Sequence, residues 1–345
     1  MRLTRIFMVI ALIMSFSVIA HAIQLSFYTG EVKILRNGKH VRVSTGIELL
    51  SGDVIQTGAS GLAEIVYGDN SRIIVRENSR VRIGTASIKG SEGAALILGR
   101  LTGKFEKLAD GSRRLYGGTA VCAIRGTELD ISAADNGDAL VQVKEGEVLV
   151  ENASGRVILK RGEQAESNVS EKPEKGKQAE LAAWLDSKEK ELDKNPEECA
   201  DKYNAYLKNL ELGSGDDGAE IDRAEKMVGA AKTGDDLSKA GKAVESAEDG
   251  VEDNIMLAET AAQALEMIAG NFRKANNRIY LEFEKTKKEA DRVAEVHRRS
   301  LADIQTLKDE FKKTHERIMG DYRGDSEKFI KGADVDSVKP EIKKY

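Results

Sequence analysis

The sequence predicts two kinds of structure in series: an all-β domain followed by an α-helical region, an α+β organisation by domain. Short runs of alternating apolar residues separated by Gly-rich turns dominate residues 23–166. From residue 179 onward, apolar residues recur at helical spacing. The charge differs as well: residues 23–170 carry 19 Lys/Arg and 18 Asp/Glu, whereas residues 171–345 carry 32 and 40. The two parts therefore differ in composition as well as in periodicity.

These patterns divide the chain into six predicted segments. They are a signal peptide at 1–22, a β domain at 23–166, a linker at 167–178, shorter helices at 179–250, a long heptad helix at 251–320 and a polar C-terminal tail at 321–345. The net charge of −5 argues against nucleic-acid binding, which normally requires a basic surface.

The N-terminus has the features of an export signal. Arg2 and Arg5 precede an apolar run of 15 residues, Ile6–Ala20, and Ala20-His21-Ala22 provides a small-x-small cleavage pattern. A spanning helix needs about 20 apolar residues, so we expect cleavage after Ala22 and a periplasmic or secreted product. The alternative is an uncleaved segment that anchors the chain in a membrane.

In the β domain, turn signals predict hairpins. Asn37-Gly38 separates two strand-like runs, and Gly68-Asp69-Asn70-Ser71 separates two more. Strands at this spacing indicate a sandwich, a roll or a short β-solenoid. A further pattern is a weak repeat at an offset of 116 residues: GEVKILRNGKHVRVSTG, from Gly30, resembles GEVLVENASGRVILKRG, from Gly146. Either the two hairpins are related, or they share only generic period-2 patterning.

The stretch Gly117–Asn152 is the most informative part of the chain. Three strand-like runs lie at 119–124, 128–133 and 139–150, and the turn Asn136-Gly137-Asp138 separates the last two. Gly126 lies inside this strand pattern, which indicates a bulge or a close approach of two backbones. The stretch contains no nucleophile with a base, no metal-ligand cluster and no phosphate loop.

Four segments of the β domain resemble the FecR domain. They are Thr119–Glu128 (TAVCAIRGTE), Val141–Val148 (VQVKEGEV), Leu50–Thr57 (LSGDVIQT) and Gly61–Ile65 (GLAEI). The resemblance covers roughly residues 27–166. It implies an exported β module and envelope signalling, in which the founding member reports on an iron-citrate transporter through a sigma factor. Only five residues precede the apolar run, so we expect no cytoplasmic domain that contacts a sigma factor.

The helical half is expected to contain several helices that are separated by Gly-rich breaks. Asn195-Pro196-Glu197-Glu198 is a helix start, and Gly213–Gly218 predicts a flexible break. From Val251 to Ile318 two registers follow a heptad, with 15 of 20 positions apolar. One long helix, about 100 Å in length, would need this stripe covered. We expect the shorter helices to fold back on it as an antiparallel bundle, with a coiled-coil homo-oligomer as the alternative.

Several residues are candidates for binding or structural roles. They are Arg72, Arg76, Arg80, Arg82, Arg113 and Arg114 as a basic patch, Asp53, Asp69 and Asp130 as Ca²⁺ ligands, Arg125 as a residue that binds a ligand carboxylate, and His297 as a pH sensor or a ligand. For each we favour a structural role: solvated strand faces, turn carboxylates that cap their own backbone, an inward Arg satisfied locally, and polar core positions such as Asn276 and His297 that set helix register. Cys122 and Cys199 are expected to be separate buried thiols rather than an interdomain disulfide.

Taken together, these patterns favour a non-enzymatic exported scaffold of the cell envelope. Its β module would bind a protein or glycan, and its helical arm would space or oligomerise it. We expect no catalytic residue, cofactor or metal, and membrane contact only through an uncleaved N-terminus. A membrane-anchored signalling component of FecR type is the first alternative. An envelope polysaccharide-active enzyme using Glu128 and Asp130, which share strand parity, is the second.

Overall fold

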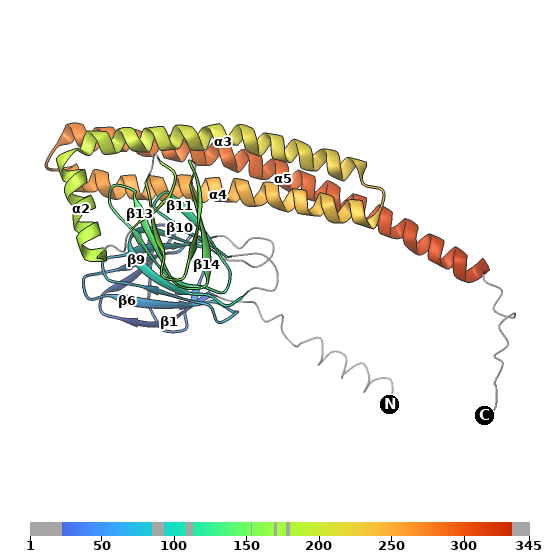
Figure 1. The fold of residues 1–345 in the computed structure, drawn as a ribbon, viewed down its shortest axis with the longest axis horizontal. Coiled ribbons are helices and arrows are strands. Elements are labelled where there is room, and N and C mark those ends of the chain that lie inside the picture. Colours follow the sequence, from blue (N-terminus) through green and yellow to red (C-terminus); the bar gives the residue numbers. More distant parts are fainter. Residues whose placement is uncertain are drawn as a thin grey trace, which may run out of the picture. The chain divides into compact units, whose positions relative to one another are not determined.

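The computed structural model describes residues 23–84, 93–107, 113–152, 154–168, 171–176 and 180–332. The predicted signal peptide, 1–22, and the end of the predicted tail, 333–345, lie outside these residues. The chain divides into two compact units. The first contains the residues up to Leu210 together with Ile255–Ala294, and the second contains Glu211–Asn254 together with the residues from Glu295 onward. A β region followed by long helices confirms the predicted fold class (Figure 1).

The β domain lies entirely in the first unit. Its strands in the described residues are β1 (Ile23–Thr29), β2 (Val32–Arg36), β3 (Lys39–Val41), β4 (Glu48–Leu49), β5 (Val54–Thr57), β6 (Leu62–Val66), β7 (Arg72–Val75), β8 (Arg80–Ile83), β9 (Ala94–Lys104), β10 (Arg113–Gly117), β11 (Ala120–Ile124), β12 (Glu128–Ala133), β13 (Ala139–Glu145), β14 (Glu147–Asn152), β15 (Gly155–Lys160), β16 (Gln164–Ser167) and β17 (Glu174–Lys175).

The strands form two sheets that share β9. The first sheet has the order β4-β1-β6-β7-β9-β12-β13-β16-β17. The second has the order β3-β2-β5-β8-β9-β10-β11-β14-β15. Among the described strands, all pairings are antiparallel except that of β9 with β10. Near its middle β9 passes from one sheet to the other at Gly99, whose φ of 93° is a conformation that side chains with a Cβ rarely adopt.

Apolar side chains from both sheets form one core between them. The alternation of buried and less buried residues along β6, β7 and β12 directs Ile65, Ile73 and Leu129 into this core, where they are fully buried. On β9, Leu96 and Leu101 belong to the same core. Burial of this apolar surface is the main term that stabilises the domain.

The predicted hairpins and repeat appear in the structure. β2–β3 and β6–β7 are hairpins around Asn37-Gly38 and around residues 68–71. In the repeated segments Ile34 pairs with Val41 and Val150 pairs with Val157, the same register at an offset of 116 residues. The two hairpins occupy equivalent positions at opposite ends of the second sheet, which favours relatedness over generic patterning.

The helices are α2 (Leu181–Lys194), α3 (Pro196–Ala230), α4 (Gly234–Phe272) and α5 (Asn277–Gly332). In the first unit, parts of α3, α4 and α5 pack together and against the outer face of the second sheet. Ala95 and Ile97 of β9 turn away from the sandwich core and join a cluster with Leu207, Leu265 and Phe283. In this unit the apolar helix stripe is therefore covered within the chain, which agrees with the predicted fold-back. None of the helices in the described residues is long and apolar enough to cross a membrane.

Two helix boundaries predicted from the sequence are wrong. The single helix over 251–320 is interrupted between Phe272 and Asn277, because Asn276 caps a new helix instead of setting register: its Oδ1 accepts hydrogen bonds from the backbone N–H groups of Arg278 and Ile279. The rings of Phe272 and Phe283 stack at 5.9 Å across the connection.

The Gly-rich break predicted at 213–218 is also wrong, because α3 continues through it. Each Gly costs a helix interior about 1 kcal/mol, a penalty that tertiary packing readily overrides. Here the side chain of Asp217 is tied to the other two long helices within the second unit. The predicted linker at 167–178 likewise contains ordered structure, since β17 pairs with β16.

Candidate functional site

The arginine positions do not form a common basic patch. Arg72 lies 3.2 Å from Glu64 on the neighbouring strand, Arg76 donates to the hydroxyl of Thr102, and Arg82 pairs with a carboxylate of α4. Each of these three cations therefore has a partner, although Arg82 lies against α4 and not on a solvated strand face as we expected.

Arg113 is the most buried of these arginines. Its guanidinium lies 3.2 Å from the carboxylate of Asp69 and 4.2 Å from the ring centroid of Tyr67. Ser71 donates from its backbone N–H and its hydroxyl to the same carboxylate. Burial raises the pKa of Asp69, but these hydrogen bonds and Arg113 outweigh it and hold the pKa below its usual value.

The three candidate Ca²⁺ ligands have separate partners. Besides Asp69, the fully buried Asp53 accepts two hydrogen bonds from Arg36 and one from the backbone of Leu50. Asp130 lies 2.9 Å from Lys144. The described residues contain no group of three or more His, Cys, Asp or Glu side chains that could hold a metal ion.

The enzymatic alternative relied on Glu128 and Asp130. Asp130 accepts a 2.7 Å hydrogen bond from Thr102 as well as its contact with Lys144, so it is held as part of a polar row across the first sheet. These contacts give Asp130 a structural role between strands of the first sheet.

Arg125 is exposed, so the prediction that it points inward is wrong. The turn around it is nevertheless tight: Gly126 has a φ of 65°, and the ladder register shifts between Glu128 and Leu129, which confirms the predicted bulge or close approach. Thr127, rather than Arg125, is buried here, and its hydroxyl donates to the backbone carbonyls of Arg125, within the turn, and of Glu147, on β14.

The two cysteines are free and buried, as favoured from the sequence. Cys122 lies on β11 inside the sandwich, and Cys199 lies near the start of α3. Burial raises the pKa of both thiols to about 12. Thiolates are scarce at such values, so neither cysteine is a reactive nucleophile.

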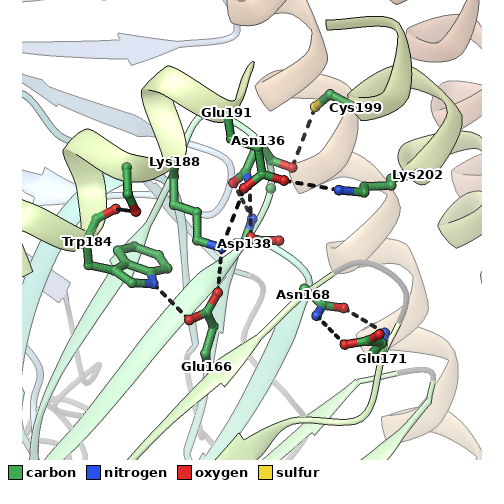
Figure 2. A network of polar contacts seen from close by, with 12 residues as sticks. Asn136, Asp138, Glu166, Asn168, Glu171, Trp184, Lys188, Glu191, Cys199 and Lys202 are labelled. Atoms are coloured by element: carbon green, nitrogen blue, oxygen red, sulfur yellow. Dashed lines mark hydrogen bonds and ion pairs between the residues drawn. The ribbon is translucent and has the colours of Figure 1, made fainter. Parts of the chain in front are cut away.

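The densest polar contacts join the turn between β12 and β13 to α2. Lys188 of α2 directs its ammonium at Asp138 in this turn, at 2.6 Å, and at Glu166 of β16, at 2.5 Å (Figure 2). The indole of Trp184 donates to the other oxygen of Glu166 at 3.0 Å, and Asn136 donates to Asp138 at 3.0 Å. We call these five residues the clamp.

The clamp is largely withdrawn from water. The side chain of Lys188 is 15% exposed and that of Asp138 is 7% exposed. Desolvation raises the pKa of Asp138, although Lys188 and Asn136 oppose it. Desolvation lowers the pKa of Lys188, but the two carboxylates outweigh it and raise that pKa. Lys188 and Asp138 therefore form a largely buried ion pair.

Neighbouring residues of α3 hold the same turn from the other side. The thiol of Cys199 donates to the carbonyl of Asn136 at 3.7 Å. A Cβ on Gly137, whose φ is 88°, would lie 2.5 Å from the hydroxyl of Tyr203. A hollow of about 10 Å³, lined by Asn136, Cys199 and Lys202, adjoins this point and has room for about one water molecule. It is too small for a ligand, so the arrangement is suited to holding elements together.

His297 is fully buried in the second unit. Its Nδ1 lies 2.7 Å from Asp217, and Asp217 accepts a 3.1 Å hydrogen bond from Asn254. The sequence identified His297 but missed Asp217, which lay in the predicted break. It also missed Lys188 and Trp184, because a Lys in a Lys/Glu-rich helix normally faces water.

The fold and the clamp define a class of protein: a β-sandwich domain in which one strand belongs to both sheets, with the helix segments of the first unit packed on one turn and one outer face. Residues 53–149 match the family model described as FecR protein. The chain therefore contains a FecR domain, and this prediction is confirmed. The match covers less than half of the chain.

Comparison with curated proteins gives no match. Among solved structures, two crystal structures of a candidate anti-sigma factor from Parabacteroides distasonis, at 2.50 Å and 1.65 Å resolution, are similar to part of the chain. Their sequence identities are 15% and 14%, and both alignments have a TM-score of 0.33. They cover 38% of this chain and 63% and 64% of those proteins, so the chain spans less than two thirds of their length.

Proposed function

We propose that this protein is a FecR-type signalling component of the cell envelope, retained in the membrane by its N-terminal apolar segment. The observation that carries the proposal is the FecR match at residues 53–149, which spans β5 to β13 and the first half of β14, including the shared strand β9. This match supports the signalling alternative better than the scaffold function that we favoured from the sequence.

In this proposal the protein is not an enzyme. The β domain binds a protein partner, and the clamp couples the turn at Asp138 to α2. Partner binding alters the helices only if the partner prefers one arrangement of the β domain over another, because a ligand shifts an equilibrium by its differential affinity. In this proposal a change in the arrangement of the β domain would be transmitted to α2 through the clamp.

Two measurements test the proposal. Intact-mass analysis of the protein from membrane and soluble envelope fractions should find the N-terminal segment retained in the membrane fraction; a soluble product that starts at Ile23 would contradict the anchor and favour an exported scaffold. Transcript profiles of a deletion strain should differ from those of the parent in a limited gene set restored by the wild-type chain. An unchanged profile would contradict signalling.

A further inference from the structure

One edge strand of the second sheet, β15, has the features of a docking strand. Within the described residues β15 pairs with β14 alone, so its other side lacks a neighbouring strand. An unpaired edge offers backbone N–H and C=O groups to an incoming extended segment.

The direction of the β15 amides follows from one hydrogen bond. The N–H of Lys160 donates to the carboxylate of Glu163 at 2.8 Å, not to β14. In an antiparallel strand, residues two apart direct their N–H groups to the same side. The amides of Ile158 and Arg156 therefore also point away from β14 and are available for a further strand.

The side chains on this edge are arranged as a template. Arg156, Ile158 and Lys160 share the exposed outer face of β15, and Ile158 is 49% exposed. Opposite them on β14 lie Glu151, Leu149 and Glu147, in that order. Each cation thus faces an anion, and the two apolar side chains face each other.

The same row continues towards the helices. Leu149 pairs with Ala123 of β11, and the neighbouring Val121 packs against the helical cluster. Ala123, Leu149 and Ile158 form a half-open apolar row that ends at the β15 edge. An incoming strand would extend this row by one residue.

We propose that β15 is the docking edge for an extended segment of a partner protein with an acidic–x–apolar–x–acidic pattern, the pattern that β14 presents on the opposite side of β15. A second copy of this chain fits less well, because antiparallel self-pairing centred on Ile158 would place Arg156 opposite Lys160. This inference rests on the proposed function only in that the partner is a protein.

The test uses the full-length chain and fluorescent peptides with the sequence Thr-Glu-Thr-Leu-Thr-Glu-Thr, with Lys in place of Glu, or with Gln in place of Glu. The acidic peptide should bind tightest by fluorescence anisotropy and should slow hydrogen exchange in residues 155–160. Exchanging both Arg156 and Lys160 for Glu should weaken it about tenfold and make the Lys peptide the better ligand. The matched control, Lys39→Glu on the edge strand β3, should leave binding unchanged.

A second pair of variants separates the backbone from the side chain. Ile158→Ala and Ile158→Pro both remove the apolar side chain, but only the proline removes the outward N–H. Binding should be weaker for the proline variant. If that variant does not fold, the charge reversal decides alone.

Three results would overturn the proposal: equal binding of the acidic and basic peptides, protection from exchange outside β15, or equal loss in folded Ile158→Ala and Ile158→Pro variants. A partner crosslinked in cells to the outer face of the first sheet would also overturn it while leaving the proposed function intact.

Discussion

Replacing Lys188 with Met tests whether the clamp holds α2 on the β domain. The substitution keeps most of the aliphatic stem and removes the charge, leaving Asp138 buried without its cation. Breaking a buried pair by removing one partner costs about 3–5 kcal/mol. The second carboxylate, that of Glu166, is 39% exposed and contributes little. We therefore expect a loss near the lower limit, about 3 kcal/mol at pH 7.

The chain supplies its own probe and control. Trp184 is the only tryptophan and donates to Glu166 inside the clamp, so its fluorescence during urea unfolding reports on this region. Lys190, two residues from Lys188 on the same helix, is 73% exposed in its pair with Asp186. Lys190→Met should change the unfolding free energy by less than about 0.5 kcal/mol.

A double-mutant cycle and a pH series identify the cause. Adding Asp138→Asn to Lys188→Met should restore about 2 kcal/mol, because the uncompensated charge is removed. Burial raises the folded-state pKa of Asp138, so protonation of this carboxyl stabilises the folded state. That contribution is fully present below the unfolded-state pKa and is lost as pH rises through the folded-state pKa. Without Lys188 this pKa rises further, so the deficit should shrink as pH falls from 7 to about 5. Equal losses for Lys188→Met and Lys190→Met, or a deficit independent of pH, would refute this reasoning.

Three further predictions concern stability. His297→Leu should destabilise the second unit by about 3 kcal/mol in thermal unfolding, whereas the double variant with Asp217→Leu should lose less; a greater loss in the double variant would contradict a compensated pair. Gly137→Ala should cost about 2 kcal/mol in urea unfolding, because its φ is 88° and the new Cβ meets Tyr203; a neutral result would be contrary evidence. Asn276→Ala should cost about 1 kcal/mol through loss of the α5 cap, and Asn276→Asp should retain most of it.

The sequence predicted the local structure of the β domain better than its pairing. Turn residues at Asn37-Gly38 and at 68–71 correctly located two hairpins, because positive φ in short loops selects Asn and Gly, which are recognisable in the sequence. Nothing local marked β9 as common to both sheets, since a period-2 pattern gives the face of each residue but not its partner strand. The sequence did offer one signal, a run of four consecutive apolar residues at Ala94–Ile97. All four are buried because both faces of β9 are covered there.

The helical half and the clamp depend on contacts between distant segments. The heptad spacing predicted helix but could not distinguish a core position from a cap at Asn276, since both favour a polar residue in an apolar register. The Gly residues at 213–218 predicted a break that packing overrides. Lys188 resembles its solvated neighbours in sequence. Its role arises because the turn at Asp138, 50 residues away, brings a buried carboxylate to it.

The shared position of β9 has a consequence for how the domain assembles. As the chain leaves the ribosome, β1 to β8 can pair with one another, but β7 and β8 each lack their second neighbour until residues 94–104 emerge. Those residues then give both sheets a partner at once, and β10 and β12 add to their other side as they follow. Assembly should consequently stall in nascent chains that stop before β9 and resume when it is exposed. A destabilising substitution in β9 should abolish cooperative unfolding of the whole domain, whereas one in an outer strand should unfold only one end of it.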